Sequence, residues 1–202
     1  MGIQAGVRQA EGICRPGGDN HPIIQGKEDA ILNMTLEEAR IKLREYHVRT
    51  GATHYYSSLS VLPILMDIKE KMKEGDRCFL SKAHACTAYH LVFGELPEKP
   101  PNAGPFCSLG MAMGFALGVA LAKPNNTIYV VTGDGEWDEG ANHEGYWAMK
   151  RLGITNVQII AECNGLQAMK SVDLDQIPND PQVTKYKTYK GEDFRCHYQN
   201  PS

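Results

Sequence analysis

Two short turns carry the residues of this sequence that are best suited to chemistry. A Gly-Asp-Gly turn at 133–135 follows one apolar, β-branched run, and a Cys-Asn-Gly turn at 163–165 follows another. Their central residues, Asp134 and Asn164, are 164 − 134 = 30 positions apart, about the length of one strand–helix–strand unit. Because ligands of open parallel sheets bind beyond the carboxyl ends of the strands, we expect the two turns to be neighbours in one binding site.

The residue types at these turns favour a magnesium ion that holds a diphosphate. Asp134 offers a charged oxygen and Asn164 a neutral amide oxygen, and Mg²⁺ prefers oxygen ligands, with phosphate oxygens and water in its remaining positions. The flanking glycines let the backbone approach a bulky anion. A Gly-Asp-Gly tripeptide alone is more often just a tight turn. The second turn, at the right distance, reverses that preference.

These turns need a framework of strands and helices that positions them. Apolar runs predict strands over 77–80, 127–131 and 157–162, and helical patterns predict helices over 109–122 and about 142–152. Strands that alternate with helices in this way form a parallel sheet with right-handed crossovers. The sequence therefore predicts an α/β fold, in which helices cover both faces of a parallel sheet.

The region before the first predicted strand is helical in pattern. Thr35 and Glu38 form a capping box at the start of a helix, and Gly51 ends it. A second helix is predicted over 60–73, and a third, after the strand, over 83–94.

We divide the chain into three parts. Residues 1–33, rich in glycine and polar residues, predict a flexible N-terminal arm. Residues 34–170 form the predicted α/β domain that would bind the diphosphate and Mg²⁺. Residues 171–202 are polar and weakly periodic, which predicts a short tail that completes or caps the domain, mostly loop with room for one strand.

Composition narrows the function classes. The 202 residues include 21 Lys and Arg against 24 Asp and Glu, a net charge of −3 without a basic stripe, which argues against a nucleic-acid partner. The longest apolar run, 111–122, is shorter than the roughly 20 residues that cross a bilayer. No signal-peptide core opens the chain and the six cysteines form no C-x-x-C pair, so we expect a cytoplasmic protein with free thiols and no membrane partner.

Five segments, in chain order, carry a resemblance to a known family. They are GATHYYSSLS (51–60), DRCFLSKAHA (76–85), CSLGMAMGFALGVALA (107–122), GDGEWDEG (133–140) and AECNGLQ (161–167). These are similar to SGHPGGSLS, DRF-x-LSKGHA, GSLGQGLSVAVGMALA, GDGE-x-x-EG and D-x-NGLQ of the thiamine-diphosphate enzymes of the transketolase type. The resemblance extends from about Leu36 to Met169.

The resemblance implies a fold, two cofactors and a reaction. The fold is the diphosphate-binding (PP-type) domain of transketolases, and the cofactors are thiamine diphosphate and Mg²⁺. The reaction transfers a two-carbon ketol, or a related acyl-anion unit, from a ketone donor to an aldehyde acceptor. The resemblance covers half of such an enzyme, which implies a split transketolase: a second subunit supplies the pyrimidine-binding domain with its catalytic glutamate, in a heterodimer or heterotetramer.

The resemblance also assigns the cofactor's anchor. Asp134, Asn164 and the carbonyl oxygen of Leu166 would bind Mg²⁺. Gly133 and Gly135 would line the diphosphate.

Further roles follow from the same motifs. His84 aligns with a catalytic histidine beside the diphosphate, and His54 with one that faces the thiazolium and the substrate. Leu109 and Gly110 align with the loop beside the aminopyrimidine. Glu139 aligns with a catalytic glutamate near the subunit contact, where paired active sites communicate.

The other two acids of GDGEWDEG have a simpler interpretation. Glu136 and Asp138 are read as charges at a helix N-terminus, which the helix dipole favours, and they are assigned no chemistry.

Several departures from the family pattern bear on the space near the cofactor and on the substrate. Met111 and Ala112 replace a Gln and a Gly, and Ala83 replaces the Gly of KGHA. The segment LPEKPPNAGPF (96–106) contains no histidine, although this loop supplies one to the substrate channel in the family. The tail segment KTYKGEDF resembles TVKGKG-x-x-F, which leaves open whether His197 approaches the diphosphate.

Two other functions stay open. The first is the α-type chain of a 2-oxoacid dehydrogenase or decarboxylase, which shares the Asp and Asn pair, although LSKAHA and the Glu139-Gly140 pair favour the transketolase type. The second is a non-catalytic cofactor-binding module. A nucleotide-binding Rossmann protein is disfavoured because no G-x-G-x-x-G follows a predicted strand.

Overall fold

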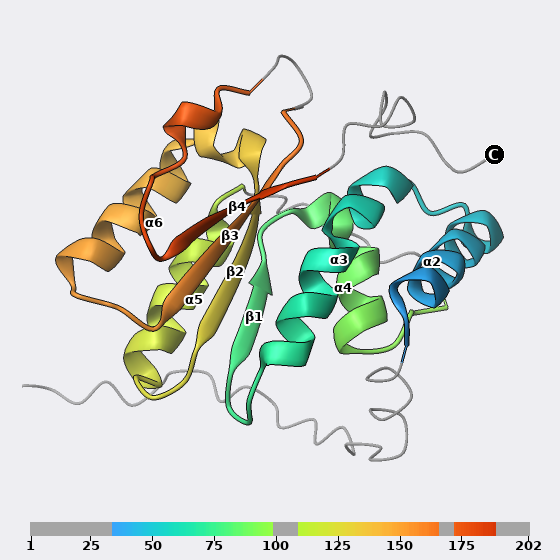
Figure 1. Ribbon diagram of the computed structural model, residues 1–202, viewed down its shortest axis with the longest axis horizontal. Helices are drawn as coiled ribbons and strands as arrows, with labels where there is room; N and C mark the ends of the chain where they lie inside the picture. Colours follow the sequence, from blue (N-terminus) through green and yellow to red (C-terminus); the bar gives the residue numbers. More distant parts are fainter. Residues whose placement is uncertain (1–33, 99–108, 166–171, 189–202) are drawn as a thin grey trace, which may run out of the picture.

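The fold is built on a parallel four-stranded sheet. The computed structural model describes residues 34–98, 109–165 and 172–188. The strands are β1 (Arg77–Leu80), β2 (Ile128–Gly133), β3 (Val157–Cys163) and β4 (Val183–Lys187), and they lie side by side in that order (Figure 1). Every neighbouring pair is parallel, which confirms the predicted α/β class.

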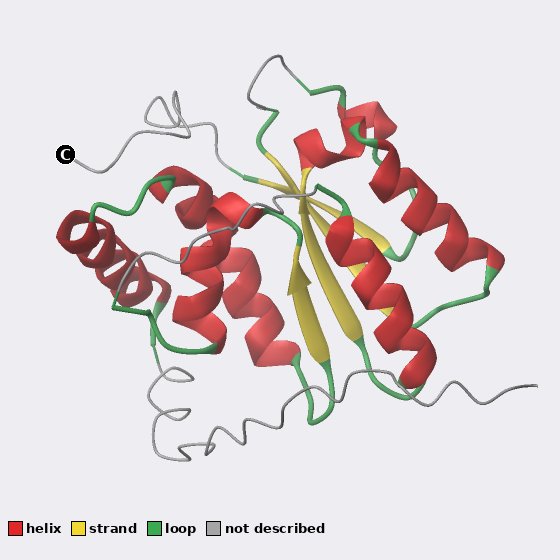
Figure 2. Cartoon of the chain, turned by 180° about the vertical axis from the view of Figure 1, so that it is seen from behind, coloured by secondary structure: helices red, strands yellow, loops and turns green. Residues whose placement is uncertain are grey.

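Helices cover both faces of this sheet (Figure 2). Neighbouring strand residues point to opposite faces: Val130 and Ile159 pack in one core, and Val131 and Ile160 in the other. The first core also contains α5 (Met111–Ala122) and α6 (Gly140–Arg151). The second contains α2 (Leu36–Thr50), α3 (Tyr55–Lys71) and α4 (Cys86–Phe93).

The N-terminal helices differ from the prediction in one place. The capping box of α2 is present, since the Thr35 hydroxyl accepts from the Glu38 N–H at 3.2 Å and the Thr35 N–H donates to the Glu38 carboxylate at 2.7 Å. Helix α3 begins at Tyr55 instead of residue 60. Buried serines in its first turns hide the apolar pattern, and Ser60 satisfies its hydroxyl by donating to the Ser57 carbonyl at 3.0 Å.

The segments next to the predicted site differ from the prediction, mainly because they contain short 3₁₀ helices. Residues 83–85 form a short 3₁₀ turn before α4. Strand β2 extends to Gly133, and a 3₁₀ helix, η2 (Asp134–Asp138), separates it from α6. A further 3₁₀ turn, η3 (Leu174–Gln176), precedes β4. The sequence pattern does not distinguish β4 from a polar tail because four of its five residues are exposed.

Some sequence predictions concern other parts of the chain. The arm 1–33 and most of the proline-rich loop lie outside the described residues. Of the helices that the structure describes, none combines the length and apolar character needed to cross a membrane. Cys78, Cys86 and Cys163, which the structure describes, are free thiols.

Candidate functional site

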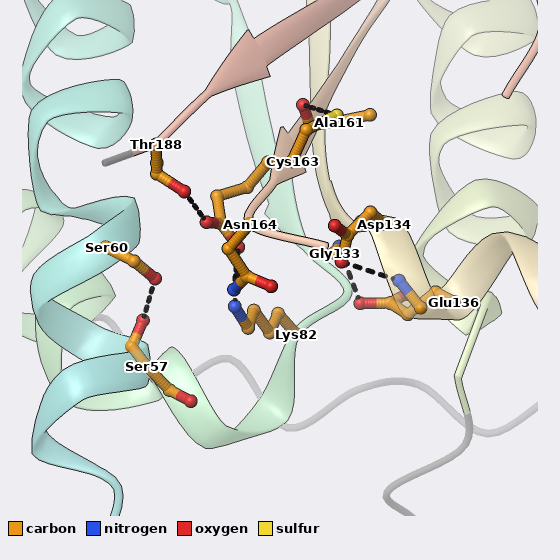
Figure 3. A network of polar contacts seen from close by, with 12 residues as sticks. Ser57, Ser60, Lys82, Gly133, Asp134, Glu136, Ala161, Cys163, Asn164 and Thr188 are labelled. Atoms are coloured by element: carbon orange, nitrogen blue, oxygen red, sulfur yellow. Dashed lines mark hydrogen bonds and ion pairs between the residues drawn. The ribbon is translucent and has the colours of Figure 1, made fainter. Parts of the chain in front are cut away.

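The predicted turns meet at the carboxyl ends of β2 and β3 (Figure 3). The Gly165 N–H donates to Oδ2 of Asp134 at 2.6 Å, and the Gly135 N–H donates to Oδ1 at 2.8 Å. The register pairs Gly133 with Glu162, two residues before Asn164. Parallel pairing therefore brings the Gly-Asp-Gly turn beside Asn164 and Gly165, as the 30-residue spacing predicts.

The Asp134 carboxylate lies in surroundings that would favour a bound cation. The side chain is buried, and this burial raises the pKa of Asp134, with the nearby Glu162 carboxylate adding to the shift. The two N–H donors and the Lys82 ammonium oppose the shift without cancelling it. A divalent cation would offset this excess of negative charge, because a bound cation favours the ionised form of the carboxylate that binds it.

Asn164 is oriented by its neighbours on β3. The side chain is buried, and its amide Nδ2 donates to Oε2 of Glu162 at 3.3 Å. This contact turns the amide oxygen, Oδ1, away from Glu162. The same Glu162 oxygen accepts from Lys82, which follows β1, at 2.7 Å. The ends of β1, β2 and β3 therefore each contribute a residue to this region.

The two predicted histidines lie together. The rings of His54 and His84 stack with centroids 4.0 Å apart and planes 8° apart. His54 occupies the N-cap position of α3 in the left-handed backbone region, with φ of 64°, and His84 follows β1 in the 3₁₀ turn. A left-handed φ is unusual for a residue other than glycine and is often found where a side chain is held for function. The stacking brings residues 30 positions apart (84 − 54) to one place.

His47 lies next to this pair but has a different character. It is fully buried, its Nδ1 lies 2.9 Å from the Ala52 carbonyl, and its Nε2 has no hydrogen-bond partner among the described residues. Burial lowers the pKa of His47, and the nearby His54 lowers it further. We assign it a packing role beside His54.

Gly110, at the N-cap of α5, contacts the segment that follows β1. Its N–H donates to the Ser81 hydroxyl at 3.1 Å, and its φ of 82° is in the left-handed region. A Cβ at this position would lie 2.7 Å from the Ala141 Cβ, at the start of α6. The neighbouring Leu109 side chain is partly exposed. Of this loop, the structure therefore shows Gly110 held tightly in place and Leu109 facing outward.

Glu136 lies at a helix start, as the sequence predicts, but it is also buried. It is the third residue of η2 and is only 3% exposed, with Oε1 accepting from the Gly133 N–H at 3.0 Å. Its Oε2 has no hydrogen-bond partner among the described residues. Burial raises the pKa of Glu136, and the Ser81 hydroxyl and the N–H groups of Gly133 and Gly110 oppose the shift. The sequence shows no signal for this burial, because acids at a helix start are usually solvated.

Because the pKa of Glu136 is raised, the effect of Glu136→Gln on the free energy of unfolding should depend on pH. Above its ordinary value of 4.5, the unfolded chain loses this proton before the folded chain does. Wild-type stability is therefore fully present below that value and falls as the pH rises through the folded-state pKa. Since glutamine does not titrate, the free energy of unfolding of the variant relative to wild type should increase from pH 4.5 to pH 8 in urea titrations.

The matched control is Glu144→Gln, on the exposed side of α6. It should change stability by less than about 0.5 kcal/mol at each pH. If the difference in the free energy of unfolding between Glu136→Gln and wild type did not change with pH, burial would not be raising the pKa of the Glu136 carboxyl.

Of the remaining predicted residues, Glu139 is the one that the structure describes, and it lies away from Asp134. Glu139 is exposed at the N-cap of α6, at the opposite end of η2 from Asp134. Leu166 and His197 lie outside the described residues, so their predicted roles stay predictions. Trp137 is fully buried, with Nε1 donating to the Thr132 hydroxyl at 3.1 Å, while Trp147 is exposed.

Sequence reasoning missed four residues that the structure places at the site. Ser81 and Lys82 follow β1, Glu162 lies in β3, and Thr188 follows β4. Lys82 lies within LSKAHA and Glu162 within AECNGLQ, so each motif contained the signal. Their pairing was missed because 80 residues separate them.

The fold and site define a class of protein. A parallel α/β sheet that brings Gly-Asp-Gly beside Asn-Gly at neighbouring strand ends is typical of domains that bind a ligand beyond the carboxyl ends of their strands. The family model described as "Thiamine pyrophosphate enzyme, C-terminal TPP binding domain" matches residues 83–195. The chain belongs to this family, whose cofactor is also called thiamine diphosphate.

Three curated relatives are similar to parts of the chain. "Ferredoxin fas2" of Rhodococcoides fascians is 26% identical over 210 residues, covering 78% of this chain and 69% of that protein. An apulose-4-phosphate transketolase subunit of Actinobacillus succinogenes is 32% identical over 111 residues, covering 53% of this chain and 39% of that protein. "2-hydroxyacyl-CoA lyase 2" of Xenopus laevis is 46% identical over 48 residues, covering 20% of this chain and 7% of that protein.

Proposed function

We propose that this chain is the thiamine diphosphate- and Mg²⁺-binding subunit of a two-chain, transketolase-like enzyme. The enzyme transfers a two-carbon ketol, or a related acyl-anion unit, from a ketone donor to an aldehyde acceptor. The observation that carries the proposal is the meeting of Asp134 with Asn164 and Gly165, held by the 2.6 Å hydrogen bond from the Gly165 N–H.

The donor set fits a magnesium ion. Asp134 supplies a buried carboxylate whose pKa is raised by burial, and Asn164 supplies an amide whose nitrogen is held by Glu162. One carboxylate and one amide leave most of the six positions of Mg²⁺ to phosphate oxygens and water, which is how this ion usually binds. Among the described residues no group of three His, Cys, Asp or Glu side chains is placed to hold a metal, and the proposed site does not need one.

The backbone around the turn also fits a bulky anion. Gly133 has an ordinary φ of −83°, and a Cβ there would lie 3.5 Å or more from its neighbours, which is normal contact. The packing of the described residues therefore does not require glycine at this position. Glycine instead leaves room on the backbone for a diphosphate.

The residues of this chain hold the cofactor and handle protons. Thiamine diphosphate, when bound, supplies the carbanion that cleaves and forms carbon–carbon bonds. Asp134 and Asn164 would hold the metal that neutralises its diphosphate. His84, two residues after Lys82, stacks on His54, and this pair is assigned to proton movement, because imidazole nitrogens can accept and donate protons.

A partner subunit would cover the exposed apolar face of α5. This helix has no charged residue, and Met111, Phe115 and Leu121 are exposed along it. These exposed residues begin next to Gly110, which the family resemblance places beside the aminopyrimidine. The relative from Actinobacillus succinogenes is named as one subunit of a transketolase. These observations support a pyrimidine-binding subunit on this face, in a heterodimer or heterotetramer.

The test is reconstitution with the product of an adjacent reading frame that carries a pyrimidine-binding domain. The two purified chains, thiamine diphosphate and Mg²⁺ are incubated with a panel of ketose donors and aldehyde acceptors. Mass spectrometry should detect an acceptor lengthened by two carbons in the mixture and with neither chain alone. Cofactor binding without any lengthened product would identify a non-catalytic module instead.

The α-type chain of a 2-oxoacid dehydrogenase is the second candidate, because it would use the same Asp and Asn pair. The same mixture separates the two when a 2-oxoacid replaces the ketose. Release of CO₂ from the 2-oxoacid, with no transfer from ketoses, would favour this second function.

A further inference from the structure

A buried carboxylate connects the strand ends that carry the proposed metal site. Its three hydrogen-bond donors, Lys82, Asn164 and Thr188, are labelled in Figure 3. Glu162, next to last in β3, is fully buried. Its Oε2 accepts from Lys82 Nζ at 2.7 Å and from Asn164 Nδ2 at 3.3 Å. Its Oε1 accepts from the Thr188 hydroxyl. The three donors come from the ends of β1, β3 and β4.

Stability alone is a weak reason for such an arrangement. Removing a carboxylate and an ammonium from water is costly, and apolar residues of similar size often serve a fold equally well. The Lys82 side chain is only 13% exposed, so both charges carry this cost. The pair therefore calls for a role that a Met–Leu pair in the same space would not fill.

The geometry suggests that role. Because Glu162 accepts from Nδ2 of Asn164, it determines which way the amide faces and directs Oδ1 away from itself. Lys82 reaches the other turn as well, since its Cδ and Cε lie 3.6 and 3.8 Å from where a Cβ on Gly133 would be. The pair thus contacts both turns that meet at Asp134.

We propose that Glu162 is a positioning residue that presents the Asn164 amide oxygen to the metal, and that Lys82 neutralises Glu162 while packing along Gly133. This inference rests on the proposed function, because it assumes a metal at Asp134 and Asn164. Glu162 and Lys82 touch neither substrate nor metal in this account. They act through Asn164 and the backbone of the Gly-Asp-Gly turn.

The proposal predicts different metal affinities for two double variants. An ion pair with only a structural role would give both variants the same affinity. In Lys82→Met/Glu162→Gln, the glutamine carbonyl can still accept from Asn164 Nδ2, and no buried charge is left unpaired. In Lys82→Met/Glu162→Leu, the space is filled but the hydrogen bond from Asn164 Nδ2 to residue 162 is lost. Using double variants avoids Lys82→Met alone, which would leave a buried carboxylate without its cation and could prevent folding.

The measurement is the affinity for Mn²⁺, followed by electron paramagnetic resonance on the full chain with thiamine diphosphate and the partner subunit. The leucine double variant should bind Mn²⁺ about 10- to 100-fold more weakly than wild type, as is typical when a group that orients a metal ligand is lost. The glutamine double variant should retain most of the wild-type affinity. Circular dichroism and urea titration check that both variants fold.

Equal Mn²⁺ affinities for the two folded double variants would overturn the positioning role. Asp134→Ala, measured in parallel, tests the assumption beneath it. If Asp134→Ala abolishes Mn²⁺ binding and the two double variants do not differ, only the role of Glu162 fails. If Asp134→Ala binds Mn²⁺ like wild type, the proposed metal site fails with it.

Discussion

Replacing Asp134 with alanine is expected to weaken the binding of thiamine diphosphate and Mg²⁺ by more than about 100-fold, because losing a ligand costs more than losing a group that orients one. Asp134 is the only charged residue in the proposed ligand set. Alanine removes the carboxylate that Gly135 and Gly165 hold at 2.8 and 2.6 Å. Isothermal titration of the cofactor into the complex of this chain with its partner measures the effect.

The matched control is Asp67→Ala, which removes an exposed carboxylate on α3 that is paired with Lys71 at 2.7 Å. Exposed pairs of this kind contribute little, so this variant should bind the cofactor like wild type. Equal affinities for Asp134→Ala and Asp67→Ala would mean that the metal lies elsewhere. Loss of the circular dichroism spectrum in Asp134→Ala would require repeating the titration with Asp134→Asn.

Gly110→Ala should produce the largest change in stability. The added Cβ would lie 2.7 Å from the Ala141 Cβ and 3.0 Å from the Asn142 nitrogen, at a φ of 82° that side chains rarely adopt. Left-handed strain and overpacking together should lower the free energy of unfolding by about 2–5 kcal/mol. The shift of the α5 N-terminus should also disturb the Ser81 contact at the end of β1. Urea denaturation of the isolated chain measures the loss.

Gly118→Ala on the same helix is the control for Gly110→Ala. None of the residues that the structure describes lies within 4 Å of a Cβ at Gly118, and alanine favours an α-helix more than glycine does. This variant should gain about 0.5–1 kcal/mol of stability. If the two alanine variants behave alike, the close approach of α5 to the start of α6 is not what constrains Gly110.

The parts of the site predicted from the sequence are those that depend on local signals. The Thr35 capping box, the strand over 77–80 and the 30-residue spacing of Asp134 and Asn164 each involve a single segment or one strand–helix–strand unit. Such patterns translate directly into structure, since parallel pairing of consecutive strands brings their carboxyl ends together. The motif resemblance adds His54 and His84, which no spacing argument would pair.

The parts that sequence reasoning misses depend on contacts between distant segments. Lys82 meets Glu162 across 80 residues, and Thr188 meets Glu162 across 26, so no local pattern reports either contact. The burial of Glu136 is hidden for a related reason. In a linear view it is one of several acids at a helix start, and only the packing of η2 against the Ser81 and Gly110 segments buries it. Tertiary burial, not residue type, determines the chemistry of these carboxylates.

The most direct test of the account is to locate the metal. Crystals of the chain in complex with its partner, grown with thiamine diphosphate and Mn²⁺ in place of Mg²⁺, would be examined by anomalous scattering. The account predicts a peak at a coordination distance of about 2.1 Å from an Asp134 carboxylate oxygen and from Oδ1 of Asn164, with diphosphate oxygens completing the site. A metal bound to the diphosphate without Asp134 and Asn164 among its ligands would contradict it.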